Sequence, residues 1–477
     1  CLGRMQQGIV PDAMSRFQTD FTRRFEDREI PLMLALDPDA GLGYEQLEQP
    51  VNTGELLNGI TFTGPVAEKV ISWGPVQELL LGKMYKPASQ RNIITITDQD
   101  INEFPESHKR KYSPGISVMF RIHGQKVFIE EAGGASATSL PGRFSAFSEE
   151  LLNHARSIAD KEQEQNPHVV FAEIAHFTEE HAANINTREH IRRYEIPVLV
   201  HSTLPAEQVI SLNDLYVSVR EGQVMIRSGR LNKRVIPRLS TAYNYKRSEL
   251  PVFRFLCDLQ YHGLASSFSL NPERLLPGLN FYPRIEYKNC VLSPAIWILN
   301  QEDVSSMLDA DDPYSAFLKL AGELNLKRYF ALSSGDRQLV FDSEEQAGIE
   351  MFLAEARNEK RVIIKEFFLP GAGESLLKNE QGEAYVHQMV AALTCTQESY
   401  SSENILQHIP LKIKRNFAPG DEWLYFKIYC APQNADYILT RKLFPLLKKY
   451  LNCSEIDQWF FIRYYDPGHH LRLRVKA

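Results

Sequence analysis

Pairs of short apolar strands, each joined by a glycine-containing turn, constrain the fold of this 477-residue chain more than any other feature. Runs rich in β-branched and aromatic residues on both sides of such a turn predict antiparallel hairpins. The pairs are residues 116–122 with 126–129, 216–219 with 224–226, and 329–332 with 339–341. Segments of helical length, such as 314–324 and 344–359, lie between them in blocks. Because strands and helices do not alternate strictly, the pattern predicts an α+β fold with large mixed sheets.

The N-terminal region predicts one amphipathic helix and then one strand. Apolar residues at i, i+3, i+7 and i+11 from Met14 to Phe25 predict a helix over residues 12–25. Residues 31–37 are mostly apolar and predict a short buried strand. Proline and glycine residues between Asp37 and Gly43 then predict a turn.

A change in the sequence pattern near residues 400–420, from a polar stretch to new strands and a helix, predicts a domain boundary. Residues 396–404 are polar and resemble a connector. A strand, an amphipathic helix and a second strand are then predicted at 423–429, 435–451 and 459–464. We therefore assign residues 1–410 to one domain and residues 415–477 to the beginning of a second α+β domain. The chain stops soon after the strand-like alternation of residues 471–475, so we expect the second domain to be truncated.

Composition and charge exclude several classes of protein. Lys and Arg number 53 against 60 Asp and Glu, and the net charge of −7 argues against a dedicated nucleic-acid-binding protein. No apolar run approaches the ~18 residues of a membrane helix. The six cysteines form no C-x-x-C pair and fit neither a zinc site nor a disulfide framework. These features predict a cytoplasmic protein with no integral membrane segment and no metal site.

Polar and basic residues are concentrated in a first segment at 183–197. Its members are Asn184, Asn186, Thr187 and Arg188, with Arg192 and Arg193 shortly after. Guanidinium groups bind carboxylate and phosphate in a bidentate fork, so the segment suits an anionic ligand. The alternative is a solvated loop before a strand, with Arg188 paired to Glu189 or Glu195.

A second segment, at 459–474, places cations on one face of a strand. His470, Arg472 and Arg474 are two residues apart and therefore share a face. Adjacent guanidinium groups repel each other unless an anion lies between them, which predicts an anion site. The alternative is an exposed edge strand whose charges prevent aggregation. A histidine beside two arginines is disfavoured as a cation, so His470 is expected to be neutral. Arg463 belongs either to the site or to an ion pair with Asp466.

Taken in order, the motifs of the chain resemble the class I lantibiotic dehydratases over most of its length. The early motifs are Asp37…Gly41-Leu-Gly43, Phe171-Ala-Glu173, Asn184-Ile-x-x-Arg188 and Tyr194-Glu-Ile-Pro197. The most specific motif is Trp423-Leu-Tyr-x-Lys427 followed by Phe461-Ile-Arg-Tyr464-x-Asp-Pro467-x-x-His-Leu-Arg-Leu-Arg474. The resemblance implies that residues 1–410 are the later part of a glutamylation domain and that residues from 415 begin an elimination domain.

The resemblance also implies a reaction. These enzymes transfer glutamate from glutamyl-tRNA to Ser and Thr hydroxyls of a ribosomally synthesised precursor peptide and then eliminate it. The implied partners are the precursor peptide and glutamyl-tRNA, the latter as co-substrate in place of a cofactor. A lanthionine cyclase and a second copy of the chain are further expected partners.

Roles for individual residues follow from the resemblance. Arg188 would bind the tRNA phosphate or glutamyl carboxylate, with Asn184 beside it in substrate binding. Asp37 would orient the peptide hydroxyl or bind the glutamyl amine. Arg472 and Arg474 would hold the glutamyl group and stabilise negative charge during elimination. Arg463 and His470 would contact substrate, and His470 would not be the catalytic base.

Two other functions compete with this one. A peptide aminoacyl-tRNA ligase would append amino acids without elimination, and the elimination-like segment after residue 415 argues against it. An inert peptide-binding scaffold would carry no reaction at all, and it would lack the remaining His and Arg of the elimination site.

Overall fold

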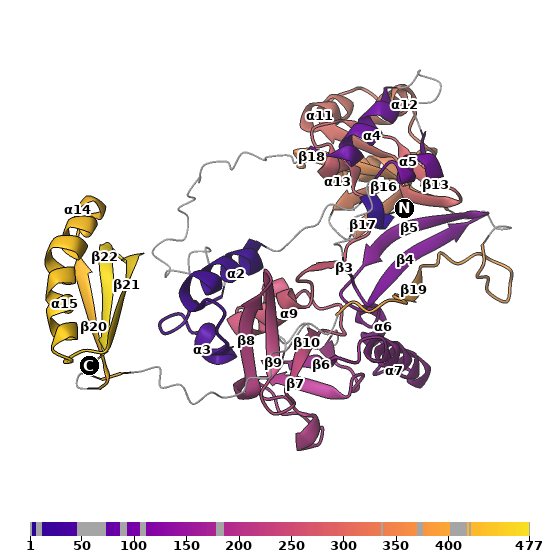
Figure 1. The fold of residues 1–477 in the computed structure, drawn as a ribbon. Coiled ribbons are helices and arrows are strands. Elements are labelled where there is room, and N and C mark those ends of the chain that lie inside the picture. Colours follow the sequence, from indigo (N-terminus) through magenta and orange to yellow (C-terminus); the bar gives the residue numbers. More distant parts are fainter. Residues whose placement is uncertain are drawn as a thin grey trace, which may run out of the picture. The chain divides into compact units, whose positions relative to one another are not determined.

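The computed structural model describes residues 2–5, 12–44, 73–85, 93–104, 111–177, 186–334, 337–369, 375–400, 417–418 and 421–476. The chain divides into two compact units, residues 1–403 and 404–477 (Figure 1). Mixed sheets and separate helices confirm the predicted α+β class.

The first sheet of unit 1 has the order β1-β8-β9-β10-β6-β7. Its strands are Ile30–Pro31, Leu215–Arg220, Gln223–Ser228, Lys233–Arg238, Val169–His176 and Tyr194–Val198. β8 and β9 form the predicted hairpin, with Leu215 opposite Ser228. β6 runs parallel to both β10 and β7, so the carboxyl ends of these three strands lie at one edge.

Helices α2 (Asp12–Phe25), α3 (Leu32–Ala35) and α9 (Pro251–Leu259) contribute the apolar core of this sheet. The bounds of α2 confirm the predicted amphipathic helix. The strand predicted at 31–37 is wrong, because only Ile30 and Pro31 pair with β8. Leu32 and Ala35 are buried whereas Met33 and Leu34 are exposed, and this i, i+3 spacing belongs to a helix.

The second sheet has the order β19-β4-β5-β14-β13-β2. Its strands are Met389–Thr394, Gly115–His123, Lys126–Gly133, Cys290–Ser293, Arg284–Tyr287 and Ile93–Ile96. β4 and β5 form another predicted hairpin, and Gly124 in its turn has φ of +58°, a conformation that favours glycine. Helices α4 (Pro75–Met84) and α5 (Asp98–Asn102) contribute to its core.

The third sheet has the order β12-β15-β18-β16-β17. Its strands are Phe281–Tyr282, Ile296–Asn300, Arg361–Glu366, Tyr329–Ser334 and Arg337–Asp342. β16 and β17 form the third predicted hairpin, although its turn residues 335–336 lie outside the described ranges. Helices α11 (Gln301–Leu308), α12 (Pro313–Glu323) and α13 (Gln346–Ala356) contribute to a core rich in phenylalanine.

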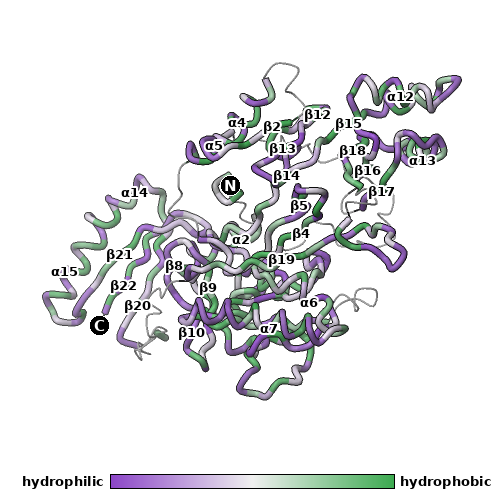
Figure 2. Tube along the Cα trace, turned by 90° about the vertical axis from the view of Figure 1, so that its right-hand side faces the viewer, coloured by the Kyte–Doolittle hydropathy of each residue, from purple (hydrophilic) through white to green (hydrophobic). Residues whose placement is uncertain are grey.

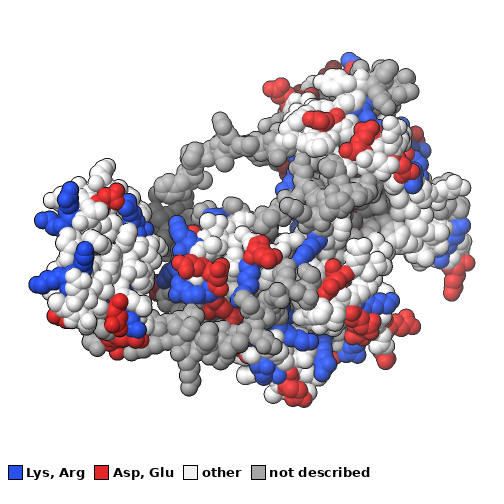
Figure 3. All heavy atoms as spheres, viewed as in Figure 1, with Lys and Arg blue, Asp and Glu red and all other residues white. Residues whose placement is uncertain are grey.

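Shorter elements complete unit 1. They are α1 (Leu2–Met5), α6 (Ser139–Gly142), α7 (Glu149–Glu164), α10 (Pro272–Leu275), the pair β3 (Lys111–Tyr112) and β11 (Leu264–Ala265), and 3-10 turns at Ala206–Gln208, Leu212–Asp214 and Tyr245–Arg247. Figure 3 shows acidic and basic side chains interspersed over the visible face. No helix of the described ranges has the length and apolarity to cross a bilayer.

Unit 2 is a three-stranded antiparallel sheet of order β20-β22-β21. Its strands are Trp423–Tyr429, His469–Lys476 and Gln458–Tyr465. α14 (Pro432–Tyr437), a π-helical turn (Ile438–Leu443) and α15 (Phe444–Asn452) follow one another along one face of the sheet (Figure 1). Along β22 and α15 the tube in Figure 2 changes repeatedly between hydrophilic and hydrophobic colours. Leu471, Leu473 and Val475 pack against the helices.

Candidate functional site

Arg188 lies in the segment between β6 and β7, where its guanidinium group is almost entirely buried. Its Nη2 donates to Glu173 Oε1 at 3.0 Å and to the Ile174 carbonyl at 2.7 Å. Its Nη1 donates to the backbone and side-chain oxygens of Asn186, both at 3.1 Å. The pairing with Glu189 or Glu195 that belonged to the solvated-loop alternative is therefore wrong, because Glu173 of β6 supplies the carboxylate. Asn184 lies outside the described residues.

Glu173 is the acceptor that connects Arg188 to the next strand. Its carboxylate accepts hydrogen bonds from the Ser240 backbone N–H at 2.7 Å and the Ser240 hydroxyl at 2.8 Å. Ser240 follows β10, whose last residue pairs with Glu173 in the sheet register. The parallel strands therefore bring these groups to one sheet edge.

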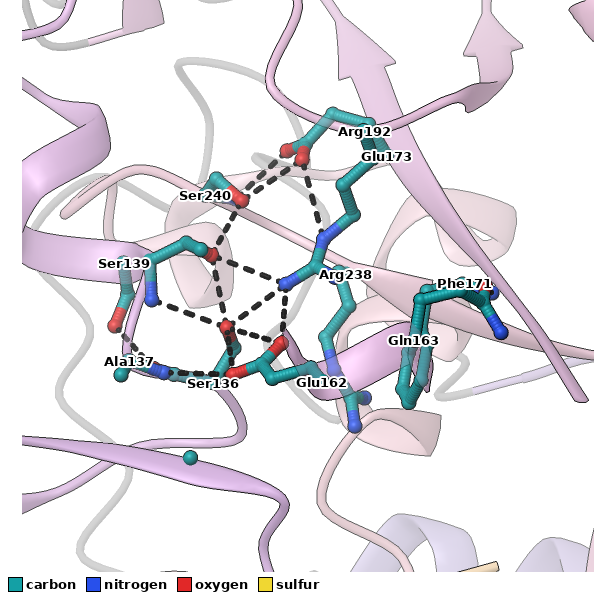
Figure 4. A network of polar contacts seen from close by, with 12 residues as sticks. Ser136, Ala137, Ser139, Glu162, Gln163, Phe171, Glu173, Arg192, Arg238 and Ser240 are labelled. Carbon is teal, nitrogen blue, oxygen red and sulfur yellow. Dashed lines mark hydrogen bonds and ion pairs between the residues drawn. The ribbon is translucent and has the colours of Figure 1, made fainter. Parts of the chain in front are cut away.

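Arg192 forms the centre of a buried polar network (Figure 4). Its Nη2 lies 2.7 Å from Glu162 Oε2 and 2.8 Å from the Ser136 hydroxyl. Its Nε lies 3.8 Å from Glu173 Oε2, so Arg192 and Arg188 share one carboxylate. The exposed fractions of the Arg192 and Glu162 side chains are 2% and 0%. Two cations and two anions thus balance inside unit 1, which buried charges require.

Helix α7 explains how Glu162 reaches this network. Its buried face carries Leu152, Ala155, Ile158, Ala159 and then Glu162. Ser148 caps the N-terminus of the helix, and its hydroxyl accepts a hydrogen bond from Leu151 N–H. A glutamate within an apolar stripe is expected only where its carboxylate pairs with another buried group.

Arg238 is another buried cation close to the network. Its side chain stacks 5.0 Å from the Phe171 ring centroid and donates to the Tyr400 hydroxyl at 2.7 Å. It also donates to the carbonyls of Pro237 and Gln260. Among the residues described, none supplies it with a carboxylate within 4.0 Å. Neutral oxygen atoms and aromatic rings therefore hold this charge.

A cavity of about 480 Å³ lies beside the network. Its lining includes Ser136, which belongs to the network, and Thr241, which follows Ser240 in the sequence. Gly133 and Gly134 line it with φ of +159° and +116°. A Cβ at Gly133 would lie 2.6 Å from the Ser266 carbonyl, so this wall accepts only glycine. Hydroxyl and amide side chains, the apolar side chains of Leu140 and Leu239, and one charge of each sign, Glu131 and Lys246, line the rest, which suits a polar ligand.

Asp258 accepts hydrogen bonds from two tyrosines near this cavity. Tyr44 donates to Oδ2 at 2.7 Å and Tyr245 donates to Oδ1 at 2.8 Å. Burial and the neighbouring carboxylate raise the pKa of both phenols above the usual range. Tyr245, which lines the cavity, is therefore a hydrogen-bonding group rather than a base.

Asp37 lies in the turn that follows α3. Its Oδ1 accepts from the N–H groups of Asp39 at 2.8 Å and Ala40 at 2.6 Å. A Cβ at Gly41 would lie 2.0 Å from the Leu34 carbonyl, which explains the glycine. Within the described ranges, Asp37 and Arg188 share no hydrogen-bond partner.

In unit 2, the side chains of His470, Arg472 and Arg474 lie on the face of the sheet opposite the helices. The guanidinium carbon of Arg472 lies 3.4 Å from the Tyr464 ring centroid. That of Arg474 lies 5.2 Å from the Tyr425 centroid and 5.4 Å from that of Phe460. The nearest described carboxylate of Arg472 is Asp466 at 3.7 Å, and none of the described carboxylates lies within 4.0 Å of Arg474. The face is cationic and lined by aromatic rings.

His470 lies beside this pair and is 2% exposed. Its Nε2 accepts a hydrogen bond from Arg472 Nε at 3.2 Å, while Nδ1 lies 2.8 Å from the Gly468 carbonyl. Both ring nitrogens of His470 therefore have partners within unit 2.

Arg463 lies on the other face of the sheet. Its register partner Leu471 packs against the helices, and Arg463 itself pairs with Asp436 of α14. Of the two alternatives for Arg463, the ion pair with Asp466 is therefore wrong, because Asp436 is the partner. The structure does not bring Arg463 to the face of Arg472 and Arg474.

Among the residues that the structure describes, no group of three or more His, Cys, Asp or Glu side chains is positioned to hold a metal ion.

Family models match both units. The model described as "Lantibiotic dehydratase, N terminus" matches residues 1–352, and "Lantibiotic biosynthesis dehydratase C-term" matches residues 423–477. The chain belongs to the lantibiotic dehydratase family. Within this family assignment, the Arg188 network lies in the part matched by the first model and the cationic face in the part matched by the second.

Individual relatives agree with the family. The nisin biosynthesis protein NisB of Lactococcus lactis subsp. lactis is 21% identical over 492 residues, covering 100% of this chain and 47% of NisB. The subtilin biosynthesis protein SpaB of Bacillus subtilis is 20% identical, covering 98% of this chain and 46% of SpaB. The chain therefore spans about half the length of these relatives.

Solved structures show the same fold. The tRNA-dependent lantibiotic dehydratase MibB from Microbispora sp. 107891 matches with a TM-score of 0.73 and 20% identity, over 100% of this chain and 46% of MibB. The glutamylation domain TbtB from thiomuracin biosynthesis matches with a TM-score of 0.53 and 15% identity, over 82% of this chain and 47% of that chain.

Sequence reasoning missed most of the network around Arg188. Glu162, Ser136 and Ser240 were not predicted as site residues. Two signals were present: a glutamate in the apolar stripe of α7, and the Gly133-Gly-Ala-Ser-Ala-Thr-Ser139 run. Neither signal specifies a partner, because the groups meet only through tertiary packing.

Proposed function

We propose that this chain contributes to tRNA-dependent dehydration of Ser and Thr in a ribosomally synthesised precursor peptide. Unit 1 takes part in glutamylation of the hydroxyl group and unit 2 in elimination of glutamate. The partners are the precursor peptide and glutamyl-tRNA, with a lanthionine cyclase and a second copy of the chain as further partners, and the reaction takes place in the cytoplasm. The cationic face of Arg472 and Arg474 carries the proposal, because it is built to hold an anion.

The elimination step explains why two guanidinium groups suit this face. A hydroxyl group is a poor leaving group, whereas an esterified glutamate departs as a carboxylate. When a base removes the α-proton, negative charge develops at the peptide carbonyl and then at the departing carboxylate oxygen. Guanidinium groups stabilise such charge and bind carboxylates in a bidentate fork.

The glutamylation step has different requirements. A hydroxyl of the peptide attacks the ester carbonyl of glutamyl-tRNA, the new ester bond forms, and the tRNA hydroxyl departs with a proton. We assign the cavity beside Ser136 and Thr241 to this step, with Arg188 as the positive charge behind it. Arg188 is held in place by Glu173 and Arg192. We also propose that the substrate contacts Asn184 and Asp37.

Intact mass of the precursor peptide tests the proposal. The complete protein that contains this chain is incubated with peptide, tRNA, glutamate and a glutamyl-tRNA synthetase. Successive losses of water are expected, and Arg474→Ala should leave glutamyl adducts instead. Arg441→Ala, a change at an exposed arginine of the π-helical turn, is the matched control and should dehydrate normally. Stable amino-acid additions by the unmodified protein would favour a ligase and end the elimination assignment.

A further inference from the structure

A second cavity lies in unit 1 apart from the residues discussed above. Its volume is about 220 Å³, and its walls come from β4, β5, β14, β15 and β18 and from residues 386–387. It therefore lies where the second and third sheets meet. Pockets for drug-sized ligands span roughly 300–1,000 Å³, so this one admits a single ring system.

Aromatic side chains form part of its wall. Phe128 and Phe368 pack with ring centroids 4.2 Å apart. The guanidinium carbon of Arg121 lies 4.3 Å from the Phe367 ring centroid. Flat apolar and guanidinium surfaces of this kind stack on planar ligands.

The cavity also has polar groups that lack partners. His387 is 7% exposed, and neither of its ring nitrogens has a hydrogen-bond partner among the described residues. Arg121 Nε is buried and unpartnered in the same sense. A neutral imidazole offers one donor and one acceptor. Buried polar groups are normally satisfied, so these atoms call for a ligand with both donors and acceptors.

Fixed charges decide what kind of ring fits. Arg121 pairs with Glu130 at 2.5 Å, and buried Glu366 lies 3.3 Å from Arg284. The two charges within each pair cancel, so these pairs favour an uncharged ring. Lys365 also lines the cavity, and none of the described carboxylates lies within 4.0 Å of it. One uncompensated lysine suits a single anionic group attached to the ring.

We propose that this cavity binds the nucleobase of a nucleotide, with Lys365 on its phosphate. A nucleobase is planar and neutral, and its edge carries adjacent donors and acceptors for His387 and Arg121. The nucleotide is either free or part of a single-stranded RNA. The proposal concerns binding alone and does not depend on the dehydration reaction.

Isothermal titration of the 477-residue chain tests this. The probes are the four nucleoside monophosphates, their nucleosides, ribose 5-phosphate and a single-stranded RNA tetranucleotide. At least one monophosphate should bind and ribose 5-phosphate should not. His387→Phe keeps a ring but removes both nitrogens, and it should weaken binding tenfold or more. His154→Phe, at an exposed histidine of α7, should leave binding unchanged.

Two further measurements distinguish RNA from a free nucleotide and provide a second variant in case the first one misfolds. Tighter binding of the tetranucleotide indicates RNA, whereas equal binding indicates a free nucleotide. Lys365→Met should abolish the preference for monophosphate over nucleoside while nucleoside binding persists, and this readout stands if His387→Phe misfolds. Failure of every nucleotide to bind, or equal binding of ribose 5-phosphate, would overturn the proposal.

Discussion

The guanidinium carbon of Arg472 lies 3.4 Å from the centroid of the Tyr464 ring, across two neighbouring strands of unit 2. The same guanidinium donates to His470 Nε2. Ring and imidazole together restrict the position of Arg472 without neutralising its charge. An arginine held in this way is prepared to receive an anion at little entropic cost.

Replacing Tyr464 tests the importance of this contact. Tyr464→Leu removes the aromatic face, and cation–π contacts contribute ~0.5–2 kcal/mol, so elimination should slow about two- to thirtyfold. Tyr464→Phe keeps the face and should stay within about twofold of the unmodified protein. The measurement is the rate at which glutamyl adducts disappear from the precursor peptide. Equal rates for both variants would show that the ring does not position Arg472.

Arg192→Met is expected to destabilise unit 1 strongly. The change leaves the Glu162 carboxylate buried without its cation, and breaking a buried pair in this way costs ~3–5 kcal/mol. The neighbouring Arg193 is exposed, and Arg193→Met should change the unfolding free energy by less than ~0.5 kcal/mol. Urea unfolding followed by tryptophan fluorescence compares the two. Similar curves would mean that the network is not buried as described.

Phe352→Ala should open a cavity in the core of the third sheet. Phe352 is 0% exposed and contacts Phe317, Phe330 and Phe341. Phe→Ala changes in such cores cost ~3–5 kcal/mol. Met351 is 53% exposed, so Met351→Ala is a neighbouring control with little expected effect. Thermal unfolding of both variants provides the measurement, and equal midpoints would contradict this packing.

Acid should weaken unit 1 through His262. Burial, and then the charge of Arg234, lower the pKa of His262 from 6.5 to about 4. Its Nε2 also accepts a hydrogen bond from Val224 N–H, which requires the neutral ring. Because the folded pKa is depressed, stability is complete above pH 6.5 and falls as the pH drops toward 4.

The size of this effect is ~2 kcal/mol after allowance for partial exposure. Unfolding free energies measured between pH 7 and pH 4.5 should decline less steeply in His262→Gln, which keeps an acceptor but does not titrate. His154→Gln, at an exposed position, should retain the full slope. An unchanged slope in His262→Gln would assign the acid sensitivity to other groups.

Local patterns predicted the hairpins and α2 because these elements depend on neighbouring residues. The strand expected at 31–37 failed because an apolar run carries no period by itself, and burial of Leu32 and Ala35 selected a helix. Arg472 and Arg474 were found because strand alternation places them together. The partners of Arg188 were not found, since Glu173, Arg192 and Glu162 come from separate elements and meet only in the folded sheet.

Strand β22 has an apolar face that packs against the helices and a cationic face on the opposite side of the sheet. Leu471, Leu473 and Val475 alternate with His470, Arg472 and Arg474. A single inserted or deleted residue would exchange the faces, placing guanidinium groups against the helices and leucines in water. Over evolutionary time this strand therefore cannot change length by one residue without moving its arginines to the wrong face. We expect related sequences to preserve the length of this strand together with its two arginines.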